Sequence, residues 1–321
     1  MKNFWKELDR PFFVLAPMFD VTDAAFRALF AKHSKPPLYP LVLFTEFVSA
    51  DGLCSIGREK LLPKLHYSNV ERPIVAQLFS AHPEKIEKAA ALCQDLGFDG
   101  VDINMGCPDR GIMRQGGCAA LIDNPNLACE IIHAAKRGAP QIPISVKTRT
   151  GMKKDKILSW VAQLLSAGLD AITLHARTVS DLSAVPARWA EIGKLSELVR
   201  AEFPDTAVIG NGDVSTLGHG LSLAREYNVD GVMVGRGAFG APWFFSCLQH
   251  ERSIHEKLRI LTEHILLFQK LCPEKNFAVI KKHFKAYISG FDGAGQLRLQ
   301  MMQTQTPSSA IQILENYLSP E

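Results

Sequence analysis

Eight short apolar runs recur along residues 12–235, and each is followed by a stretch of helical character. The runs are rich in β-branched residues and are nearly continuous rather than alternating. This pattern is typical of strands that are buried on both faces of a parallel sheet. We therefore predict strands at 12–16, 41–44, 74–79, 100–104, 144–148, 171–175, 207–211 and 231–235.

Amphipathic segments lie between these runs. In residues 83–96 the side chains of Ile86, Ala89, Ala90 and Cys93 fall at helical spacing, and residues 125–135 and 154–167 show the same pattern. Several segments end in a glycine just before the next strand, as expected for a helix-to-strand connection. Eight strands alternating with helices over about 245 residues predict an α/β fold, a closed (β/α)8 TIM barrel. A doubly wound open sheet is the structural alternative.

The strand pattern stops near residue 245. From residue 251 onward, Leu258, Leu261, Ile265 and Phe268 are spaced as on one face of a helix, and residues 277–289 and 306–318 are also helical in pattern. We therefore predict a barrel domain over residues 1–249 and a small helical domain over residues 250–321.

The composition fits a soluble globular protein, with 47% hydrophobic and 21% charged residues. The net charge of +3 is too small to indicate nucleic-acid binding, so any RNA contact must come from a local patch. The polar N-terminus does not resemble a signal peptide, and no apolar run approaches the roughly 18 residues of a membrane span. We expect a cytoplasmic protein that does not bind a membrane.

Seven cysteines are scattered along the chain, and no two form a Cys-x-x-Cys pair. This argues for free thiols in a reducing compartment and against a disulfide scaffold or a metal site. Cys107 stands out because it lies in a Gly-Cys-Pro turn just beyond a predicted strand, where a thiol can donate a proton or act as a nucleophile. Cys93 and Cys129 fall in helical stretches, where cysteine acts as a small hydrophobe. Cys118 is the main competitor for the role of Cys107.

Polar and special residues gather where the predicted strands end. Barrel enzymes place their chemistry at these carboxyl ends, and core packing does not explain so many polar groups on one rim. The residues are Pro17, Met18, Gln77, Asn104, Cys107, Lys147, Arg149, His175, Arg177, Asn211, Gly212, Asp213, Gly235 and Arg236.

The end of the eighth strand is the best candidate for binding phosphate. Gly235-Arg236-Gly237 lets backbone amides approach an anion, and Arg236 adds charge. By itself the motif is equally consistent with a plain turn. Together with Asn211-Gly212-Asp213 it suggests a phosphorylated cofactor across the barrel mouth.

Two further side chains have a structural and a functional interpretation. Lys147 ends an otherwise apolar strand, and a buried ammonium needs an anionic or polar partner. That partner is either a cofactor that gains negative charge or a carboxylate at the exposed end of the strand. His175 either binds a phosphate or substrate or is a satisfied structural histidine.

The motifs, in this order, resemble the tRNA-dihydrouridine synthase family over nearly the whole chain. The most specific segment is Asp-x-Asn-x-Gly-Cys-Pro at 102–108. The other matching segments are 16–18, 45–47, 76–78, 116–119, 145–149, 175–178, 211–213 and 235–237, and in the tail 281–285 and 291–294.

This resemblance implies an oxidoreductase that carries FMN, is reduced by NADPH and converts uridine in tRNA to dihydrouridine. Hydride would pass from N5 of FMN to C6 of uracil, and Cys107 would donate the proton to C5. Asn104, Arg149 and Arg177 would lie near the uracil. The residues expected to hold FMN are Pro17, Met18, Phe19, Gln77, Lys147, His175, Asn211, Gly212, Asp213, Gly235 and Arg236.

The resemblance also implies that the helical tail binds RNA. Lys281, Lys282 and Lys285, with His283 and Arg298, supply positive charge for tRNA phosphates, and the alternative is a solvated helix face. We expect tRNA rather than DNA as the partner and a monomeric protein.

One segment departs from the family pattern. After His175-Ala176-Arg177-Thr178 the family shows an aromatic, glycine-containing stretch that ends in Ala-Asp-Trp. Here residues 179–189 lack the tyrosine, and Arg188 replaces the aspartate. The loop at 34–40 also looks longer than usual.

Three other functions stay open on the sequence. One is an FMN barrel reductase of a free pyrimidine or an enone, which would not need the basic tail. Another is a Schiff-base aldolase with Lys147 as the nucleophile and residues 235–237 binding a substrate phosphate. The third is an RNA-binding protein without catalysis, against which the retained Cys107 argues.

Overall fold

A computed structural model describes residues 3–248 and 251–319. Eight parallel strands close into a barrel, with β1 paired to β2 on one side and to β8 on the other. The predicted barrel is thereby confirmed over the open sheet. The strands are β1 (Phe12–Leu15), β2 (Leu41–Ser49), β3 (Ile74–Phe79), β4 (Gly100–Met105), β5 (Ile144–Arg149), β6 (Ala171–His175), β7 (Ala207–Asn211) and β8 (Gly231–Val234).

Strand β2 is longer than predicted. The sequence pattern ended at Phe44 because Thr45 and Glu46 are polar, yet both are fully buried. The register to β3 shifts between Phe44 and Phe47, as at a β-bulge. Such an irregularity turns side chains away from the regular alternation, so a polar pair can continue the strand.

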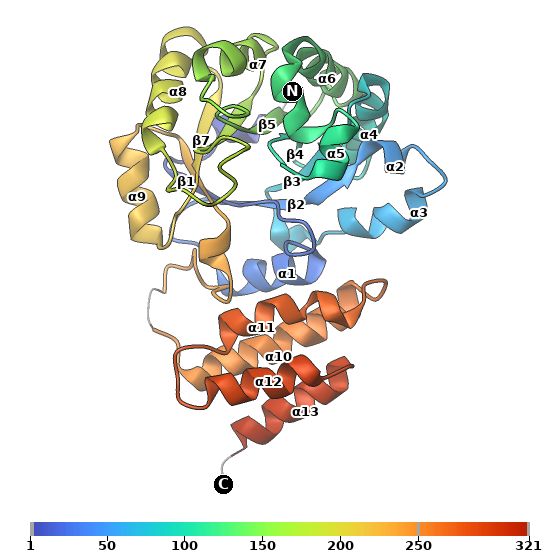
Figure 1. Cartoon of the computed structure of the whole chain (residues 1–321), viewed down its shortest axis with the longest axis vertical. Helices are drawn as coiled ribbons and strands as arrows, with labels where there is room; N and C mark the ends of the chain where they lie inside the picture. The colour runs from blue at the N-terminus through green and yellow to red at the C-terminus, as the bar shows by residue number, and fades with distance from the viewer. Residues whose placement is uncertain (1–2, 249–250, 320–321) are drawn as a thin grey trace.

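Helices surround the barrel between successive strands (Figure 1). The predicted helix at 154–167 is shorter, because residues Ile157–Val161 form a π-helical turn before α7 begins. The helices of the barrel are α1 (Ala24–His33), α2 (Ala50–Leu53), α3 (Arg58–Leu61), α4 (Pro83–Asp95), α5 (Arg110–Arg114), α6 (Pro125–Gly138), α7 (Ala162–Ser166), α8 (Trp189–Glu202) and α9 (Leu217–Glu226).

The N-terminal segment closes the barrel at the amino ends of the strands. Trp5, in a short 3-10 turn, is fully buried and packs on the rings of Phe12 and Phe44, with centroids 5.6 and 6.4 Å away. These rings belong to the apolar cluster of inward-facing strand residues. The polar side chains of the cavity described below lie at the opposite end, where the strands finish.

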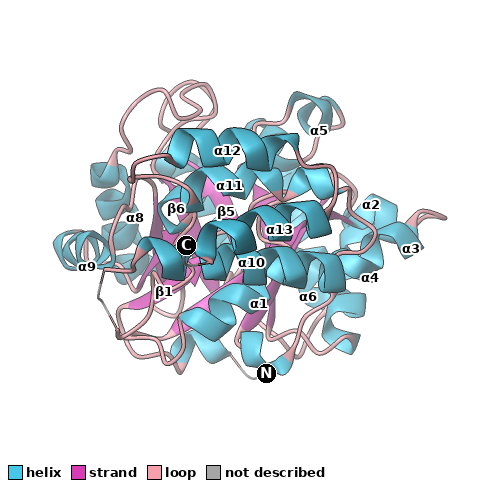
Figure 2. Ribbon diagram, turned by 90° about the horizontal axis from the view of Figure 1, so that it is seen from below, coloured by secondary structure: helices cyan, strands magenta, loops and turns pink. Residues whose placement is uncertain are grey.

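The C-terminal part is helical, as predicted, and comprises α10 (Ile254–Leu271), α11 (Lys281–Tyr287), α12 (Ala294–Gln303) and α13 (Pro307–Leu318). Figure 2 views the molecule from the side of these helices, and α10 is the one that packs on α1. Ala24, Ala25 and Leu29 of α1 share one apolar core with Leu258, Leu261 and the other buried residues of the helical part. The predicted domain boundary at residue 249 lies outside the described residues. No helix in the described ranges is long and apolar enough to span a bilayer.

Candidate active site

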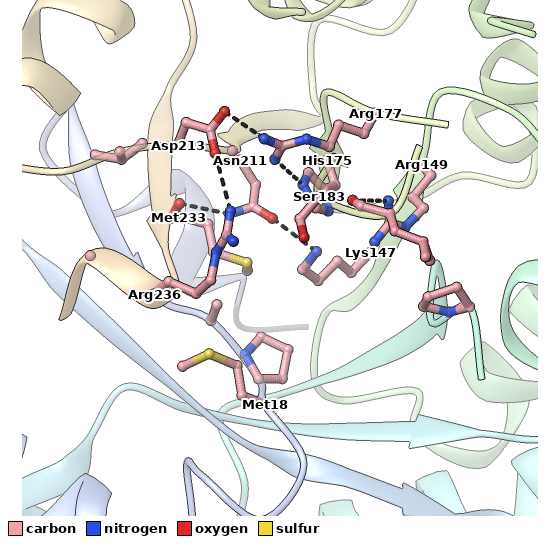
Figure 3. A pocket seen from close by; sticks show the side chains of 18 of the residues that line it. Met18, Lys147, Arg149, His175, Arg177, Ser183, Asn211, Asp213, Met233 and Arg236 are labelled. Carbon is pink, nitrogen blue, oxygen red and sulfur yellow. Dashed lines mark hydrogen bonds and ion pairs between the residues drawn. The ribbon is translucent and has the colours of Figure 1, made fainter. Parts of the chain in front are cut away.

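A cavity of about 750 Å³ opens at the carboxyl ends of the strands. Figure 3 shows the side chains of Lys147, His175 and Asn211, from the ends of β5, β6 and β7, around it. Most of the residues predicted from the strand-end pattern therefore meet in one place. Those that line the cavity are Pro17, Met18, Lys147, Arg149, His175, Arg177, Asn211, Gly212, Asp213, Gly235 and Arg236.

Lys147 and Asn211 are joined across the inner end of the cavity. Lys147 Nζ donates to Asn211 Oδ1 at 3.1 Å, and Asn211 Nδ2 donates to the carbonyl oxygen of Met233 at 2.9 Å. Burial lowers the pKa of Lys147 to about 8, with a further contribution from Arg149 and opposition from Asp102. The ammonium has no carboxylate in direct contact among the described residues, so it is available to an anion in the cavity.

Arg177 links two neighbouring strand ends. Its guanidinium donates to His175 Nε2 at 3.1 Å and pairs with Asp213 Oδ2 at 2.6 Å. Burial, and then the cations Lys147 and Arg149, hold the pKa of His175 far below its ordinary value. His175 is therefore a neutral imidazole that accepts from Arg177 at Nε2 and carries its proton at Nδ1.

The loops after β7 and β8 approach each other closely at this rim. Gly212 has a φ of +136°, and a Cβ there would lie 2.7 Å from that of Ala187. A Cβ on Gly237 would lie 2.1 Å from the carbonyl oxygen of Val214. Arg236 bridges the same loops through Asp213 Oδ1 at 3.3 Å. Glycine is thus required on both loops, as in backbone cradles for anions.

The cavity carries an excess of positive charge. Lys147, Arg149, Arg177 and Arg236 line it, while Asp213 is the carboxylate among its described lining residues. Burial lowers the pKa of Arg149 to about 10, which leaves the guanidinium charged near neutral pH. Such a set of donors favours a ligand with phosphate or another anionic group.

Gln77 and Asn104 are not among the residues that line the cavity but belong to a buried polar network. Gln77 Nε2 donates to Asp102 Oδ2 at 2.7 Å, and Asn104 Nδ2 donates to Gln77 Oε1 at 3.0 Å. Ser145 Oγ donates to the other oxygen of Asp102 at 2.6 Å, and burial raises the pKa of this carboxyl to about 6. The network holds Asn104 so that its Oδ1 accepts from the amides that follow it, including that of Cys107 at 2.9 Å.

Cys107 and Cys118 lie together at the edge of the cavity, next to the lining residue Pro108. Cys107 is half-buried, whereas Cys118 is fully buried. Interaction with the Cys118 side chain lowers the pKa of Cys107 to about 7, against the effect of burial and with help from Arg149. The same interaction raises the pKa of Cys118, so Cys107 is the thiol of the pair that titrates near neutral pH.

The divergent loop after β6 is held by ion pairs over one side of the cavity. Arg188, which stands where the family has aspartate, contacts Asp155 at 3.1 Å and Asp181 at 2.8 Å. Arg177 Nε also donates to the carbonyl oxygen of Val185 at 2.7 Å. The loop brings residues to the cavity that the sequence pattern did not single out, because they follow no strand periodicity: Leu182 and Ser183.

Phe19 lies outside the cavity lining. It is 52% exposed and packs on Phe47, with ring centroids 5.5 Å apart, while Lys64 Nζ lies 4.2 Å from its centroid.

The basic residues predicted in the tail are in different environments. Lys282 and Lys285 are exposed on α11, whereas Lys281 Nζ donates to the carbonyl oxygens of Met302 and Thr304 at the end of α12. Arg298 donates to the carbonyl oxygen of Ile288 at 2.7 Å, and His283 is buried. Lys282 and Lys285 are therefore the members of the set that face solvent.

Comparison with known proteins agrees with this geometry. A family model described as dihydrouridine synthase (Dus) matches residues 14–320. The chain is 37% identical to "Probable tRNA-dihydrouridine synthase 2" of Bacillus subtilis, covering 98% of this chain and 97% of the relative. It is 36% identical to "Probable tRNA-dihydrouridine synthase" of Staphylococcus epidermidis, covering 98% and 96%.

Among solved structures, histamine dehydrogenase from Rhizobium sp. 4-9 is similar in fold, with a TM-score of 0.53 and 13% identity. The match covers 81% of this chain and 49% of that one, so the similarity concerns only part of the larger protein. With a family match over nearly its full length and the family's motifs gathered at one barrel mouth, the chain belongs to the dihydrouridine synthase family.

Proposed function

We propose that this protein reduces the C5–C6 double bond of uridine in tRNA, with FMN as its cofactor, NADPH as the reductant and Cys107 as the proton donor. It would thus be an oxidoreductase acting on a CH–CH group. Membership of the dihydrouridine synthase family supports a flavin cofactor, and the names of its relatives support tRNA as substrate. The same match disfavours an aldolase based on Lys147.

The cavity fits a flavin mononucleotide in both size and charge. Its volume of about 750 Å³ lies within the usual range for cofactor sites, roughly 300–1,000 Å³. Arg236 and the glycine-rich turns beside Asp213 would hold the phosphate, and Lys147 would face the part of the ring that gains negative charge. When bound, the flavin supplies the hydride that reduces C6 of the uracil. Pro17 and Met18 would form the opposite wall, and Phe19 would lie at its outer edge.

The proton is held by this chain's own residues. A thiol with a pKa of about 7 is substantially protonated near neutral pH and can protonate C5 as charge develops on the uracil. The thiolate left behind would be stabilised by the neighbouring Cys118 side chain and by the charge of Arg149. The observation that carries the proposal is this supported thiol beside a cationic cavity at the barrel mouth.

The uracil must leave its stack to enter the cavity, as in other enzymes that act on a base. Arg149 and Arg177 would border it, and both are fixed by their contacts. Arg149 donates to the carbonyl oxygens of Gly106 at 2.9 Å and Thr178 at 3.0 Å. Asn104 would contribute by positioning the loop of Cys107, because its Oδ1 accepts from the Cys107 amide while its Nδ2 donates to Gln77.

The helical part is well placed to bind tRNA phosphates. His283 of α11 packs on Phe239 of the loop after β8, with ring centroids 5.8 Å apart, so α11 adjoins that loop of the barrel. Its exposed Lys282 and Lys285 would therefore contact the backbone of an RNA whose target base is in the cavity. Lys281 would contribute less, since its ammonium is occupied by the end of α12.

The proposal is tested by incubating the purified, flavin-loaded protein with an unmodified tRNA transcript, free uridine and free uracil. We expect NADPH-dependent gain of two hydrogens at a uridine of the tRNA, seen by nuclease digestion and mass spectrometry. Replacing NADPH by NADH decides the choice of reductant. Faster reduction of the free base or nucleoside than of the tRNA would instead support the small-molecule reductase.

A further inference from the structure

Lys275 belongs to the helical part of the chain, and its side chain contacts carboxylates of the barrel domain outside the cavity. It lies in the turn after α10, and its side chain is 8% exposed. Its Nζ is 2.9 Å from Glu46 Oε2, 3.4 Å from Asp23 Oδ2 and 3.5 Å from Asp20 Oδ1. One ammonium thus meets carboxylates from β2, from the start of α1 and from the loop between β1 and α1.

The Asp23 and Glu46 carboxylates also accept hydrogen bonds from backbone amides, and one of these amides belongs to Asp20. Asp23 caps α1 by accepting from the amide of Phe26 at 3.0 Å. Glu46 Oε1 accepts from the amide of Asp20 at 2.6 Å, and Asp20 has a φ of +55°. The conformation of the loop before α1 therefore depends on where the Glu46 and Asp23 carboxylates are held.

Two ammonium groups of the described residues lie at this cluster, and Lys275 is the one that contacts all three carboxylates. Lys64 lies 3.6 Å from the other Glu46 oxygen. Two neutral groups also face the ammonium: burial raises the pKa of Cys272 to about 12, and burial holds the pKa of His283 well below its ordinary value. Although burial opposes it, the attraction of Asp23 and Glu46 raises the pKa of Lys275 to about 12.

The same loop forms a wall of the cavity at its other end. Pro17 and Met18 line the cavity. The Met18 amide donates to Thr22 Oγ1 at 2.9 Å, and the Thr22 amide donates to the Met18 carbonyl oxygen at 3.0 Å. Residues 17–23 are thus one hydrogen-bonded unit with the cavity at one end and Lys275 at the other.

We propose that Lys275 is a positioning residue through which the helical part of the chain fixes the β1–α1 wall of the flavin cavity. The inference rests on the proposed flavin site. Under this proposal, flavin binding depends on the docking of the helical part against the barrel. Lys275 and its partner Glu46 are 229 residues apart in the sequence. Removing a partner from a buried ion cluster leaves uncompensated charge, so the loop must move or a carboxyl must take up a proton.

The test compares Lys275→Met with the full-length wild type, both freed of flavin. FMN affinity is measured by quenching of flavin fluorescence, and hydrogen–deuterium exchange is followed in residues 17–23. Lys270→Met is the matched control, since it removes an exposed charge from the last turn of α10. Lys275→Arg tests rescue by another cation. Glu46→Gln combined with Lys275→Met removes the carboxylate charge nearest to the lost ammonium while keeping an oxygen for the Asp20 amide.

We expect Lys275→Met to weaken FMN binding about tenfold, within the range typical of coupling between sites, and to speed exchange in residues 17–23. The control should match the wild type, and Lys275→Arg and the double variant should recover most of the affinity. Wild-type affinity and exchange in Lys275→Met would overturn the inference. If that variant does not fold, a folded double variant that still binds FMN poorly would overturn it as well.

A wild type that fails to bind FMN would contradict the proposed function instead. The exchange measurement would then still decide whether Lys275 holds the loop.

Discussion

Cys118 is buried beside Cys107, and the interaction of the two side chains lowers the pKa of Cys107 while it raises that of Cys118. A hydrogen-bond donor beside a sulfur favours the thiolate over the thiol, so the pKa of Cys107 falls to about 7 although burial acts in the opposite direction. In an enzyme that uses Cys107 as an acid, this contact makes the thiol a better proton donor and sets the pH above which the donor is lost.

Replacing Cys118 by alanine removes that donor. The pKa of Cys107 should rise, so the alkaline limb of the pH–rate profile should move to higher pH, while the rate near neutral pH falls because the thiol is a weaker acid. Single-turnover reduction of tRNA by the reduced enzyme across pH 6 to 9 measures this. Cys247→Ala is the control, since Cys247 is exposed. An unmoved alkaline limb in Cys118→Ala would show that Cys118 does not set the pKa of the acid that titrates in this profile.

Lys147 should make flavin binding sensitive to pH. Because burial lowers its pKa to about 8, the ammonium is charged below that pH and loses its charge as the pH rises through it. FMN affinity should therefore decline across pH 8 in the wild type. In Lys147→Met it should be weaker at neutral pH and lack this step. Equilibrium dialysis from pH 6.5 to 9.5 measures both, and a step of equal size in the variant would exclude Lys147 as its source.

Two buried histidines between barrel and helical part should limit stability in acid. Burial lowers the pKa of His264 to about 4 and that of His283 well below its ordinary 6.5. Below pH 6.5 the unfolded chain takes up protons that the folded chain refuses, so stability is full above 6.5 and is lost as the pH falls. Each histidine contributes a slope of about 1.4 kcal/mol per pH unit.

Urea unfolding at pH 7.5, 6.0 and 5.0 tests this for the wild type and for His264→Phe. The substitution should reduce the slope of the free energy of unfolding against pH by about 1.4 kcal/mol per pH unit, since it removes a group that only the unfolded state protonates. An equally steep decline in the variant would assign the acid sensitivity to other residues.

The exposed lysines of α11 should contribute to tRNA affinity through counterion release. Replacing Lys282 or Lys285 by alanine should weaken binding and reduce the slope of log K against log salt by about 1 for each lysine. Lys194→Ala, on the outer helix α8, is the control. Filter binding at several salt concentrations measures the slopes. Unchanged slopes in both α11 variants would show that this helix face is only solvated.

The barrel was predictable because strands buried on both faces carry continuous apolar runs, and because the carboxyl ends of such strands must share one rim. On this basis Lys147, His175 and Asn211 were expected at one rim, and they line one cavity. The hydrogen bond between Gln77 and Asn104 could not be predicted, because it depends on the register between β3 and β4.

Long-range partners explain what the sequence pattern missed. The polar Glu46 was expected to lie beyond its strand, but it is buried within β2 because Lys275, far along the chain, compensates its charge. Lys281 looked like part of an RNA-binding run, yet the end of α12 occupies its ammonium. Leu182 and Ser183 reach the cavity through a loop whose shape depends on Arg188 and its carboxylate partners. None of these contacts leaves a local periodicity.

The central claim is that Cys107 delivers the proton to C5 at a flavin-containing barrel mouth. The most direct measurement compares wild type and Cys107→Ala, both loaded with FMN, for dihydrouridine formed in tRNA per turnover of NADPH-reduced enzyme. We predict that the variant keeps its flavin absorbance and tRNA affinity while dihydrouridine formation falls at least roughly a hundredfold, the usual scale for loss of a general acid. Undiminished dihydrouridine formation by Cys107→Ala would contradict the claim.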